Sequence, residues 1–550
     1  MYLKCNRRKK DGKEHRYWSI VESRRCAGGR VVQRPVLYLG EINDSQREAW
    51  IRSIEVFDED AGRQGKLALF SSDREIPEAV ADGIGVCLSQ FVLKRPRQWG
   101  AYWLFTEFWE QLGLREFWAQ KLGRSREGTE WEHVLEVLVA NRLIDPGSEW
   151  RLHRHWYAHS AMGDLLGEDD TLAAKDTLYR CLDKLVEHKQ ALFAHLCERW
   201  RDLFGVKFEV LLYDLTSTYF ESPPPEDPAD KRKFGYSRDK RSDCVQVVIA
   251  LIVTPEGFPL SYEVLPGNTA EKTTLRSFLD KIEAAYGQTE RVWVMDRGIP
   301  TEEVLEQMRA SEPPVHYLVG TPKGRLGKLE KELATRPWGQ VREGVEVKLL
   351  PRQNELYVFA QSRDRVNKER AMRRRQLKKL WKRLHELREK KGRRDELLIK
   401  LGQAKAASPS AWRLVRVEVD AQGELTFALR RQKFREAIRR EGRYLLRSNL
   451  SDQDPARMWS LYMMLTQIEE AFKNLKGDLA IRPIHHQLET RIEAHIFVAF
   501  LAYCLHVTLR HRLRRHAPGL TPRAVLEKLG AIQMLDAYFP TTDGRWLVFA

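Results

Sequence analysis

The order of apolar segments between Phe208 and Pro322 constrains the fold of this chain more than any other feature. Three strand-like runs come first, "FEVLLYDLTSTYF", "CVQVVIALIV" and "FPLSYEVLPGN", and the turn "TPEG" joins the second to the third. An amphipathic helix, a fourth strand ("RVWVMDRG"), a second helix opened by Thr301 and a fifth strand ("VHYLVGTP") follow. This order predicts an α/β fold with one mixed sheet flanked by helices.

The same order is that of an RNase H-like sheet, in which the first and fourth strands are neighbours. Each of these two strands carries an aspartate after an apolar run, Asp214 in "LLYD" and Asp296 in "VWVMD". A buried carboxylate without compensation costs several kcal/mol, and converging carboxylates repel unless a cation lies between them. We therefore expect a cation at this edge of the sheet, and magnesium suits an all-oxygen site that also takes phosphate.

The segment "LYMMLTQIEEAFKNLKGD" offers a third carboxylate, Glu469. Tyr462, Glu469 and Lys476 are spaced by seven residues, about two helical turns, so they are expected on one helical face together with Lys473. Glu470 is turned about 100° away. A phenol and ammonium groups around a carboxylate suit a metal ligand beside phosphates. The alternative is a solvated helix with i,i+4 Glu–Lys pairs.

Long ordered motifs connect this chain to a known family: "YDLTSTYFES", "FGYSRDKRSDCVQVV", "GFPLSYEVLPGN", "VMDRG" and "IEEAFKNLK". With them the chain resembles the DDE insertion-sequence transposases, whose catalytic helix carries a Tyr-x2-Arg-x3-Glu-x6-Lys signature, and within them the long-chain group with "YDLTSTYFE". The motifs span roughly residues 205 to 515. One position departs from the signature, because Leu465 stands where the family has arginine.

The resemblance implies a two-metal site for phosphodiester hydrolysis and transesterification, with Asp214, Asp296 and Glu469 as catalytic residues and ligands of Mg²⁺, for which Mn²⁺ substitutes. It implies that Tyr462, Lys473 and Lys476 bind DNA phosphates near the cleaved bond. The implied partners are the terminal inverted repeats of the element and target DNA, bound by a homodimer. Leu465 removes one phosphate contact, which Arg443 or Arg447 is a candidate to replace.

Composition agrees with a nucleic-acid partner. The 550 residues include 93 Lys+Arg and 77 Asp+Glu, a net charge of +16 with a pI near 9.4. Seven dispersed cysteines indicate reduced thiols rather than a disulfide or zinc framework. No secretion signal is visible. The apolar run Ile496 to Leu509 is shorter than the roughly 20 residues of a membrane span, so we expect a buried helix, no membrane and a cytoplasmic protein.

Changes of pattern along the chain predict six parts. These are a basic N-terminal β-hairpin arm and linker (1–90), a helical and DNA-binding domain (91–205), the first part of the core (206–321), an α+β insertion with a basic α-hairpin (322–450), the second part of the core (451–516) and a tail (517–550). The insertion segment Arg363 to Lys400 holds seventeen Lys/Arg against six Asp/Glu. It is interpreted as a DNA clamp, with a solvated α-hairpin as the alternative.

Several further residues have both a functional and a purely structural interpretation. Arg297 is a candidate phosphate ligand or a solvated charge, and the loop with Arg238, Lys240 and Arg241 is a candidate DNA contact or a soluble loop. Structural roles are expected for His485, His486 and His495, because no carboxylate or cysteine spacing completes a metal set. A helix-turn-helix after Arg142, with Ser148 as N-cap, is an alternative to two ordinary packed helices.

Three functions remain open at this point. The leading one is a DDE transposase that cuts its element's ends and joins them to target DNA. The second is an RNase H-like nuclease that stops at hydrolysis, which a strand-transfer assay distinguishes. The third is a catalytically inactive DNA-binding derivative, which metal-dependent nicking excludes.

Overall fold

The computed structural model describes most of the chain beyond residue 84. The described residues are 2–10, 13–25, 31–40, 55–58, 63–66, 85–123, 125, 128–270, 274–287, 291–296, 300–321, 329, 332–333, 335–352, 354–389, 394–450, 454–541, 544 and 546–549. Their contacts divide the chain into two compact units, one of 1–104, 153–170 and 526–550, the other of 105–152 and 171–525.

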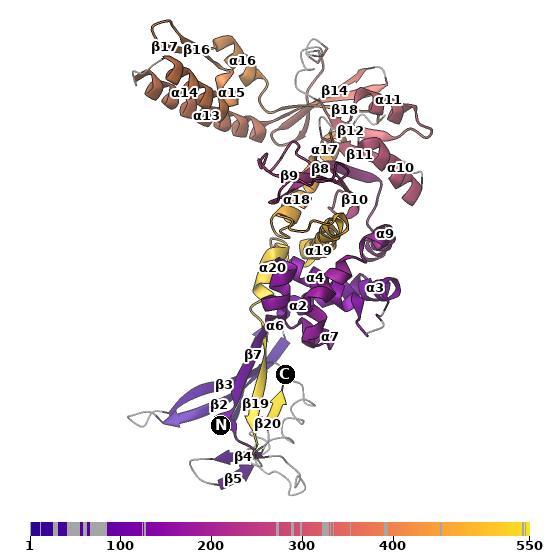
Figure 1. Cartoon of the computed structure of the whole chain (residues 1–550), viewed down its shortest axis with the longest axis vertical. Helices are drawn as coiled ribbons and strands as arrows, with labels where there is room; N and C mark the ends of the chain where they lie inside the picture. Colours follow the sequence, from indigo (N-terminus) through magenta and orange to yellow (C-terminus); the bar gives the residue numbers. More distant parts are fainter. Residues whose placement is uncertain are drawn as a thin grey trace. The chain divides into compact units, whose positions relative to one another are not determined.

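A nine-stranded sheet organises the larger unit (Figure 1). Its first five strands are β10 (Pro259–Pro266), β9 (Val245–Val253), β8 (Val210–Phe220), β11 (Val292–Met295) and β12 (His316–Gly320), in that spatial order. β8 and β9 are antiparallel, whereas β8, β11 and β12 are parallel. This order confirms the predicted RNase H-like sheet, with the first and fourth strands as neighbours.

Helices α9 (Lys189–Phe204), α10 (Leu275–Tyr286) and α11 (Glu302–Ala310) contribute to the core on one face of these strands. Tyr213 of β8 and Met295 of β11 face that core. The side chain of Thr301 accepts a hydrogen bond from the Val304 N–H, which confirms the predicted start of α11. Because side chains alternate along a strand, the residues after Tyr213 and Met295 lie on the opposite face.

The predicted insertion contributes strands to this same sheet. β18 (Arg443–Ser448), β15 (Glu355–Ser362), β14 (Val345–Arg352) and β13 (Gly339–Arg342) continue the order beyond β12. β18 pairs antiparallel with both β12 and β15. The sheet is therefore nearly twice as wide as the five strands that the sequence indicates.

The basic α-hairpin has a core of its own. Its helices are α13 (Arg363–Glu389) and α14 (Arg394–Ala407), followed by the short α15 (Pro409–Trp412), and beside them lie β16 (Val415–Val419) and β17 (Leu425–Leu429) (Figure 1). Leu380, Leu384 and Leu387 are buried in this core, and Trp381 and Trp412 pack against it. α16 (Arg431–Arg439) then leads to β18.

Helices from distant parts of the sequence pack around α19 (Glu489–His516), including α4 (Trp131–Ile144) and α8 (Lys175–Leu182). By length and composition α19 is the one described helix that is apolar enough to cross a membrane, yet 94% of its apolar window is buried within the protein. The predicted buried helix is thus confirmed. Two further helices of this unit are α3 (Leu114–Leu122) and α5 (Glu149–Arg151), whose N-cap is Ser148 as predicted.

The segment expected to form one helix around Glu469 is two helices, α17 (Pro455–Met463) and α18 (Leu465–Lys476). The break at Met464 corrects the expectation that Tyr462, Glu469 and Lys476 follow one continuous helical face.

The described residues of the smaller unit form three small sheets. The first is antiparallel and consists of β1 (Tyr2–Lys10), β2 (Lys13–Arg25) and β3 (Val31–Gly40), one strand more than the predicted hairpin. The second consists of β4 (Glu55–Asp58), β5 (Arg63–Lys66) and β6 (Gly85–Val86). The third joins β7 (Val92–Gln98) to β19 (Gln533–Pro540) and β20 (Trp546–Phe549) from the opposite end of the chain.

Short helical segments complete the smaller unit and its connections. They are α2 (Gly100–Gln111), α6 (Tyr157–His159), α7 (Met162–Leu166) and α20 (Pro522–Leu529). Arg97 is 2% exposed and pairs with Asp536 at 2.7 Å and Asp164 at 2.7 Å, which explains how a cation is buried in β7. The compact units therefore group residues differently from the six consecutive parts predicted along the chain.

Candidate active site

The register of two parallel strands brings Asp214 and Asp296 side by side. Tyr213 of β8 is the partner of Met295, the last residue of β11. Asp214 follows Tyr213 within β8, and Asp296 directly follows the end of β11. Both lie on the sheet face opposite the α10 and α11 core, as the alternation of side chains requires. Oδ1 of Asp214 accepts a 2.8 Å hydrogen bond from the Leu215 N–H.

Helix α18 packs against β8 and carries Glu469 to the same place. Asp214, Asp296, Glu469 and Tyr462 all line one cavity of about 420 Å³. Carboxylates from two strands and one helix, separated by 255 positions of sequence, thus converge on a space open to solvent.

The insertion supplies another wall of this carboxylate cavity. From α13 this wall includes Arg365, Lys368 and Glu369, and from β18 it includes Arg443 and Tyr444. Oε1 of Glu369 pairs with Arg365 at 2.9 Å, and its Oε2 accepts from the Gly442 N–H at 3.0 Å, so this fourth carboxylate already has partners. Burial raises the pKa of Tyr444, whose ring packs edge-on against that of Tyr462 at 5.7 Å.

Of the two arginines suggested as replacements for the missing signature arginine, Arg443 is the one that lines the carboxylate cavity. Leu465 lines this cavity too and is 8% exposed. Arg447, the other candidate, pairs instead with Glu302 at 2.6 Å and Glu355 at 2.7 Å.

Comparison with known proteins now decides the family. Residues 207–505, more than half of the chain, match the family described as "Transposase DDE domain". The chain belongs to the DDE transposases. Residues 3–55 match a second family, "IS1634 family transposase, N-terminal domain", so this DDE transposase is that of an insertion sequence. The predicted family, a DDE insertion-sequence transposase, and its function are confirmed, and with them a divalent-metal-dependent enzyme that acts on DNA. The narrower "YDLTSTYFE" group stays a prediction.

The other comparisons add little. No curated protein matches the transposase significantly. Among solved structures, the "Cryo-EM structure of piggyBac transposase synaptic complex with hairpin DNA" matches with a TM-score of 0.36 and 9% identity, over 78% of each chain. That likeness is too weak to support a conclusion.

The predicted DNA-binding lysines lie outside the carboxylate cavity. Lys476 pairs with Asp239 at 3.0 Å, and Arg482 binds the same carboxylate. Burial lowers the pKa of Lys476, whereas hydrogen bonds from Arg482 and Lys476 outweigh burial and lower that of Asp239. Lys473 lines a separate cavity with Glu470, which pairs with Arg510 at 3.0 Å. Glu470 is thus turned away from Glu469's cavity, as its helical position predicts.

The loop before β9 presents its cations differently. Arg241 pairs with Glu221 at 2.7 Å and Asp243 at 3.0 Å, and its guanidinium lies 4.7 Å from the Tyr219 ring centroid. Arg238 is half-buried, and Lys240 is exposed with a φ of 60°, in the left-handed region. Arg297 lies outside the described residues.

A distant carboxylate completes the histidine set that the sequence leaves incomplete. Glu149 Oε1 lies 3.2 Å from His486 Nε2 and 3.8 Å from His495 Nδ1. The expectation that no carboxylate joins these histidines is therefore wrong, because Glu149 comes from α5, more than 300 positions earlier. His485 is not part of this cluster.

A guanidinium group, that of Arg142, already lies beside this cluster. Nη2 of Arg142 lies 3.4 Å from Nδ1 of His495, and Arg142, Glu149 and His495 are all buried. Hydrogen bonds from the histidines outweigh burial and hold the pKa of Glu149 well below its usual range, and burial lowers the pKa of His495 to about 4. A dication here would face the Arg142 guanidinium, so the arrangement supports a structural role.

Proposed function

We propose that this transposase cuts the ends of its element and joins them to target DNA with Asp214, Asp296 and Glu469 as ligands of two Mg²⁺ ions, for which Mn²⁺ substitutes. The observation that carries the proposal is the convergence of these three carboxylates on one cavity. Carboxylate oxygens are the hard ligands that magnesium prefers, and a wall of hydroxyl, guanidinium and ammonium groups leaves room for phosphate.

The metal supplies one part of the chemistry. When bound, divalent ions lower the pKa of the attacking water or 3′-hydroxyl and stabilise the leaving oxygen of an in-line displacement. The protein supplies the rest. Asp214 and Asp296 are fixed by paired strands, whose register sets the spacing of their carboxylates, and Glu469 is fixed by the packing of α18 on β8. Such rigid support is what orientation at phosphorus requires.

Cations around the cavity hold the DNA. Arg443 replaces the signature arginine, and with Tyr462 and Lys368 it donates to phosphate oxygens beside the cleaved bond. Farther from the cleaved bond, the DNA-binding residues of this proposal are Lys476, Arg238, Lys240, Arg241 and Arg297. Lys476 does so through its pairing with Asp239, which ties α18 to the loop before β9.

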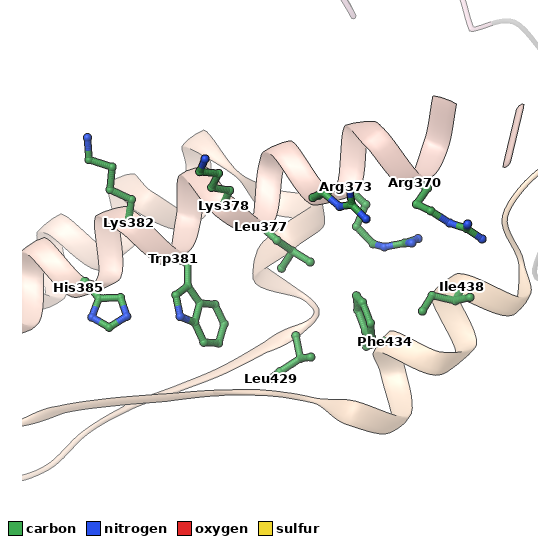
Figure 2. A pocket seen from close by; sticks show the side chains of 11 residues that line it. Arg370, Arg373, Leu377, Lys378, Trp381, Lys382, His385, Leu429, Phe434 and Ile438 are labelled. Atoms are coloured by element: carbon green, nitrogen blue, oxygen red, sulfur yellow. The ribbon is translucent and has the colours of Figure 1, made fainter. Parts of the chain in front are cut away.

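The hairpin of α13 and α14 acts as a clamp on DNA. Figure 2 shows Leu377, Trp381 and His385 pointing from α13 toward Leu429 and Phe434, whereas Lys382 extends away from them. Arg370 and Arg373 line the same cavity near Phe434 and Ile438. The apolar side chains of α13 thus pack within the insertion, with the Trp381 ring edge-on to the Phe427 ring at 5.2 Å. Lys378 and Lys382 are exposed. Exposed cations on a helix suit the binding of DNA phosphates.

The partners follow from the reaction. The transposase binds terminal inverted repeats and target DNA, and it pairs two ends as a homodimer in the cytoplasm. Two other functions compete with this proposal. A nuclease that stops at hydrolysis would cut but would not join pre-cut ends, and an inactive DNA-binding derivative would not nick DNA in Mg²⁺.

The test is cleavage and strand transfer on a duplex that contains the element's end, in Mg²⁺. We expect the wild type to do both, and Asp214→Ala, Asp296→Ala and Glu469→Ala to bind DNA without cutting it. Glu470→Ala is the matched control on the same helix, and it should retain far more cleavage than Glu469→Ala. Normal cutting by both aspartate variants would refute the assignment, and cutting by Glu469→Ala but not by Glu470→Ala would show a wrong helical register.

A further inference from the structure

A second cavity lies on the side of α18 away from the carboxylate cavity. Its volume is about 440 Å³, and it is lined by the C-terminal half of α18, the C-terminal half of α19 and the segment 518–523. Glu469 lines the first cavity and Glu470 lines this one, so consecutive residues of one helix face two different spaces. We call it the α18–α19 cavity.

The charges of the α18–α19 cavity do not cancel. Four cations line it, Lys473, Arg510, Arg514 and Arg523, against two carboxylates. Glu470 pairs with Arg510 at 3.0 Å and Asp478 with Arg523 at 3.4 Å. In the described part of the chain, Lys473 and Arg514 are exposed and have no carboxylate partner; Arg514 donates only to Gln467 Oε1, at 3.4 Å. Two positive charges are left over at the rim.

Buried polar groups form the inner wall of the same cavity. Asn474 is 6% exposed and His506 is 4% exposed, and both line the cavity. Nδ2 of Asn474 and Nδ1 of His506 have no hydrogen-bond partner among the described residues. A buried donor left without a partner costs about 1–3 kcal/mol, so a ligand that accepts from Asn474 would recover this free energy. Burial lowers the pKa of His506 to about 4, so it stays neutral there.

We propose that the α18–α19 cavity binds a backbone phosphate of duplex DNA, away from the bond that is cut. The proposal rests on the proposed function, because it assigns a second contact to the same substrate. A phosphodiester supplies what the cavity lacks, a negative charge for Lys473 and Arg514 and an acceptor for Asn474 Nδ2. Lys473, expected from the sequence beside the cleaved bond, thus holds the duplex from the far side of α18.

The test measures DNA affinity against salt concentration, with a chelator present so that no cleavage occurs. The double variant Lys473→Ala/Arg514→Ala is compared with Lys207→Ala/Arg276→Ala, which removes the same charge from exposed positions outside both cavities. The slope of log affinity against log salt should become shallower by about 1 to 2 in the first variant, because each phosphate contact releases about 0.9 counterion. Equal slopes in the two variants would overturn the proposal.

A second variant tests whether the Asn474 side chain contacts DNA or is only a buried amide without a hydrogen-bond partner. Asn474→Leu removes the unpartnered donor at similar volume, so the protein without DNA should be at least as stable while its DNA affinity falls several-fold. Unchanged affinity in Asn474→Leu would contradict the proposal. Inorganic phosphate is the third arm. If it raises the melting temperature of the wild type but not of Lys473→Ala/Arg514→Ala, while the salt slopes on DNA stay equal, the cavity binds free anions and the DNA proposal is wrong.

Different results would refute the proposed function and the α18–α19 cavity proposal. Wild-type protein that neither cuts nor joins element ends in Mg²⁺ would refute the proposed function, whatever the salt slopes show. Wild-type protein that cuts, together with equal slopes for both double variants, would refute only the α18–α19 cavity as a DNA contact.

Discussion

In the part of the chain that the structure describes, two groups of side chains of the types that bind metals differ in access and charge. Asp214, Asp296 and Glu469 line a cavity of about 420 Å³ with room for an ion and a phosphate. The Glu149, His486 and His495 cluster is buried and includes the Arg142 guanidinium, 3.4 Å from a histidine nitrogen. The comparison teaches that residue type alone does not identify a metal site, because a buried neighbouring cation can turn a set of potential ligands into a structural network.

The largest expected effects come from one isosteric Glu→Gln substitution in each cluster, because the two variants should fail in different ways. Glu469→Gln should abolish cleavage, a larger loss than the about 10–100-fold typical of residues that only support a metal ligand, and it should leave stability unchanged or slightly higher. Glu149→Gln should lower the free energy of unfolding by about 3–5 kcal/mol, because the Glu149 carboxylate is the charge that opposes the buried Arg142 guanidinium. Cleavage rates and denaturant unfolding measure both, and loss of activity in a still stable Glu149→Gln protein would contradict the structural role.

A second difference is the response to pH. His495 has a pKa lowered by burial to about 4, against 6.5 in the unfolded chain, so between these values the unfolded state binds more protons. Stability should therefore rise with pH from about 4 to 6.5, by up to roughly 3 kcal/mol for this group. His495→Gln should flatten that rise in the melting temperature, although His506 adds a similar component. An equally steep rise in the variant would show that His495 is not buried as a neutral group.

Arg443 provides a smaller effect within the carboxylate cavity. Arg443→Gln should slow cleavage about 10-fold, which is about 1.4 kcal/mol, because a charge-assisted phosphate contact is lost. Arg416→Gln, which removes an exposed arginine from β16, is the control. Leu465→Arg should raise cleavage, most of all in the Arg443→Gln background. If Leu465→Arg brings no gain in either background, the signature position makes no phosphate contact in this transposase.

The last prediction concerns the salt dependence of the clamp. Arg374, Lys378 and Lys382 are exposed on α13, and in the described residues none of them pairs with a carboxylate. Arg374→Gln/Lys378→Gln/Lys382→Gln should make the dependence of log affinity on log salt shallower by up to about 2.7, while Arg201→Gln/Lys207→Gln/Arg276→Gln should change it little. Identical slopes would favour a solvated α-hairpin.

The sequence predicts the part of the fold that depends on local pattern. Each of the five strands from Val210 to Gly320 is an apolar run between turn residues, and Thr301 caps its helix by a contact three residues away. The convergence of Asp214 with Asp296 follows from strand order alone. These features could be predicted because their causes lie within a short stretch of chain.

Features that depend on distant pairing could not be predicted in this way. β18 has only six residues and its strand pairing comes from β12 and β15, so the widened sheet and Arg443's place in the cavity were not visible in the pattern. Glu149 joins His486 across 337 positions, and no spacing rule covers such a distance. The break at Met464 moved Tyr462 onto another helix without a proline or glycine to signal it.

The most direct test of the central claim asks whether the aspartates touch the metal. Asp214→Cys and Asp296→Cys should be inactive in Mg²⁺ and regain cleavage in Mn²⁺, because a thiolate is a poor ligand for magnesium and a better one for manganese. Asp214→Ala and Asp296→Ala should remain inactive with either ion, and Glu306→Cys, exposed on α11, should cut with both. Cysteine variants that cut equally well in Mg²⁺ and Mn²⁺ would contradict metal binding by Asp214 and Asp296.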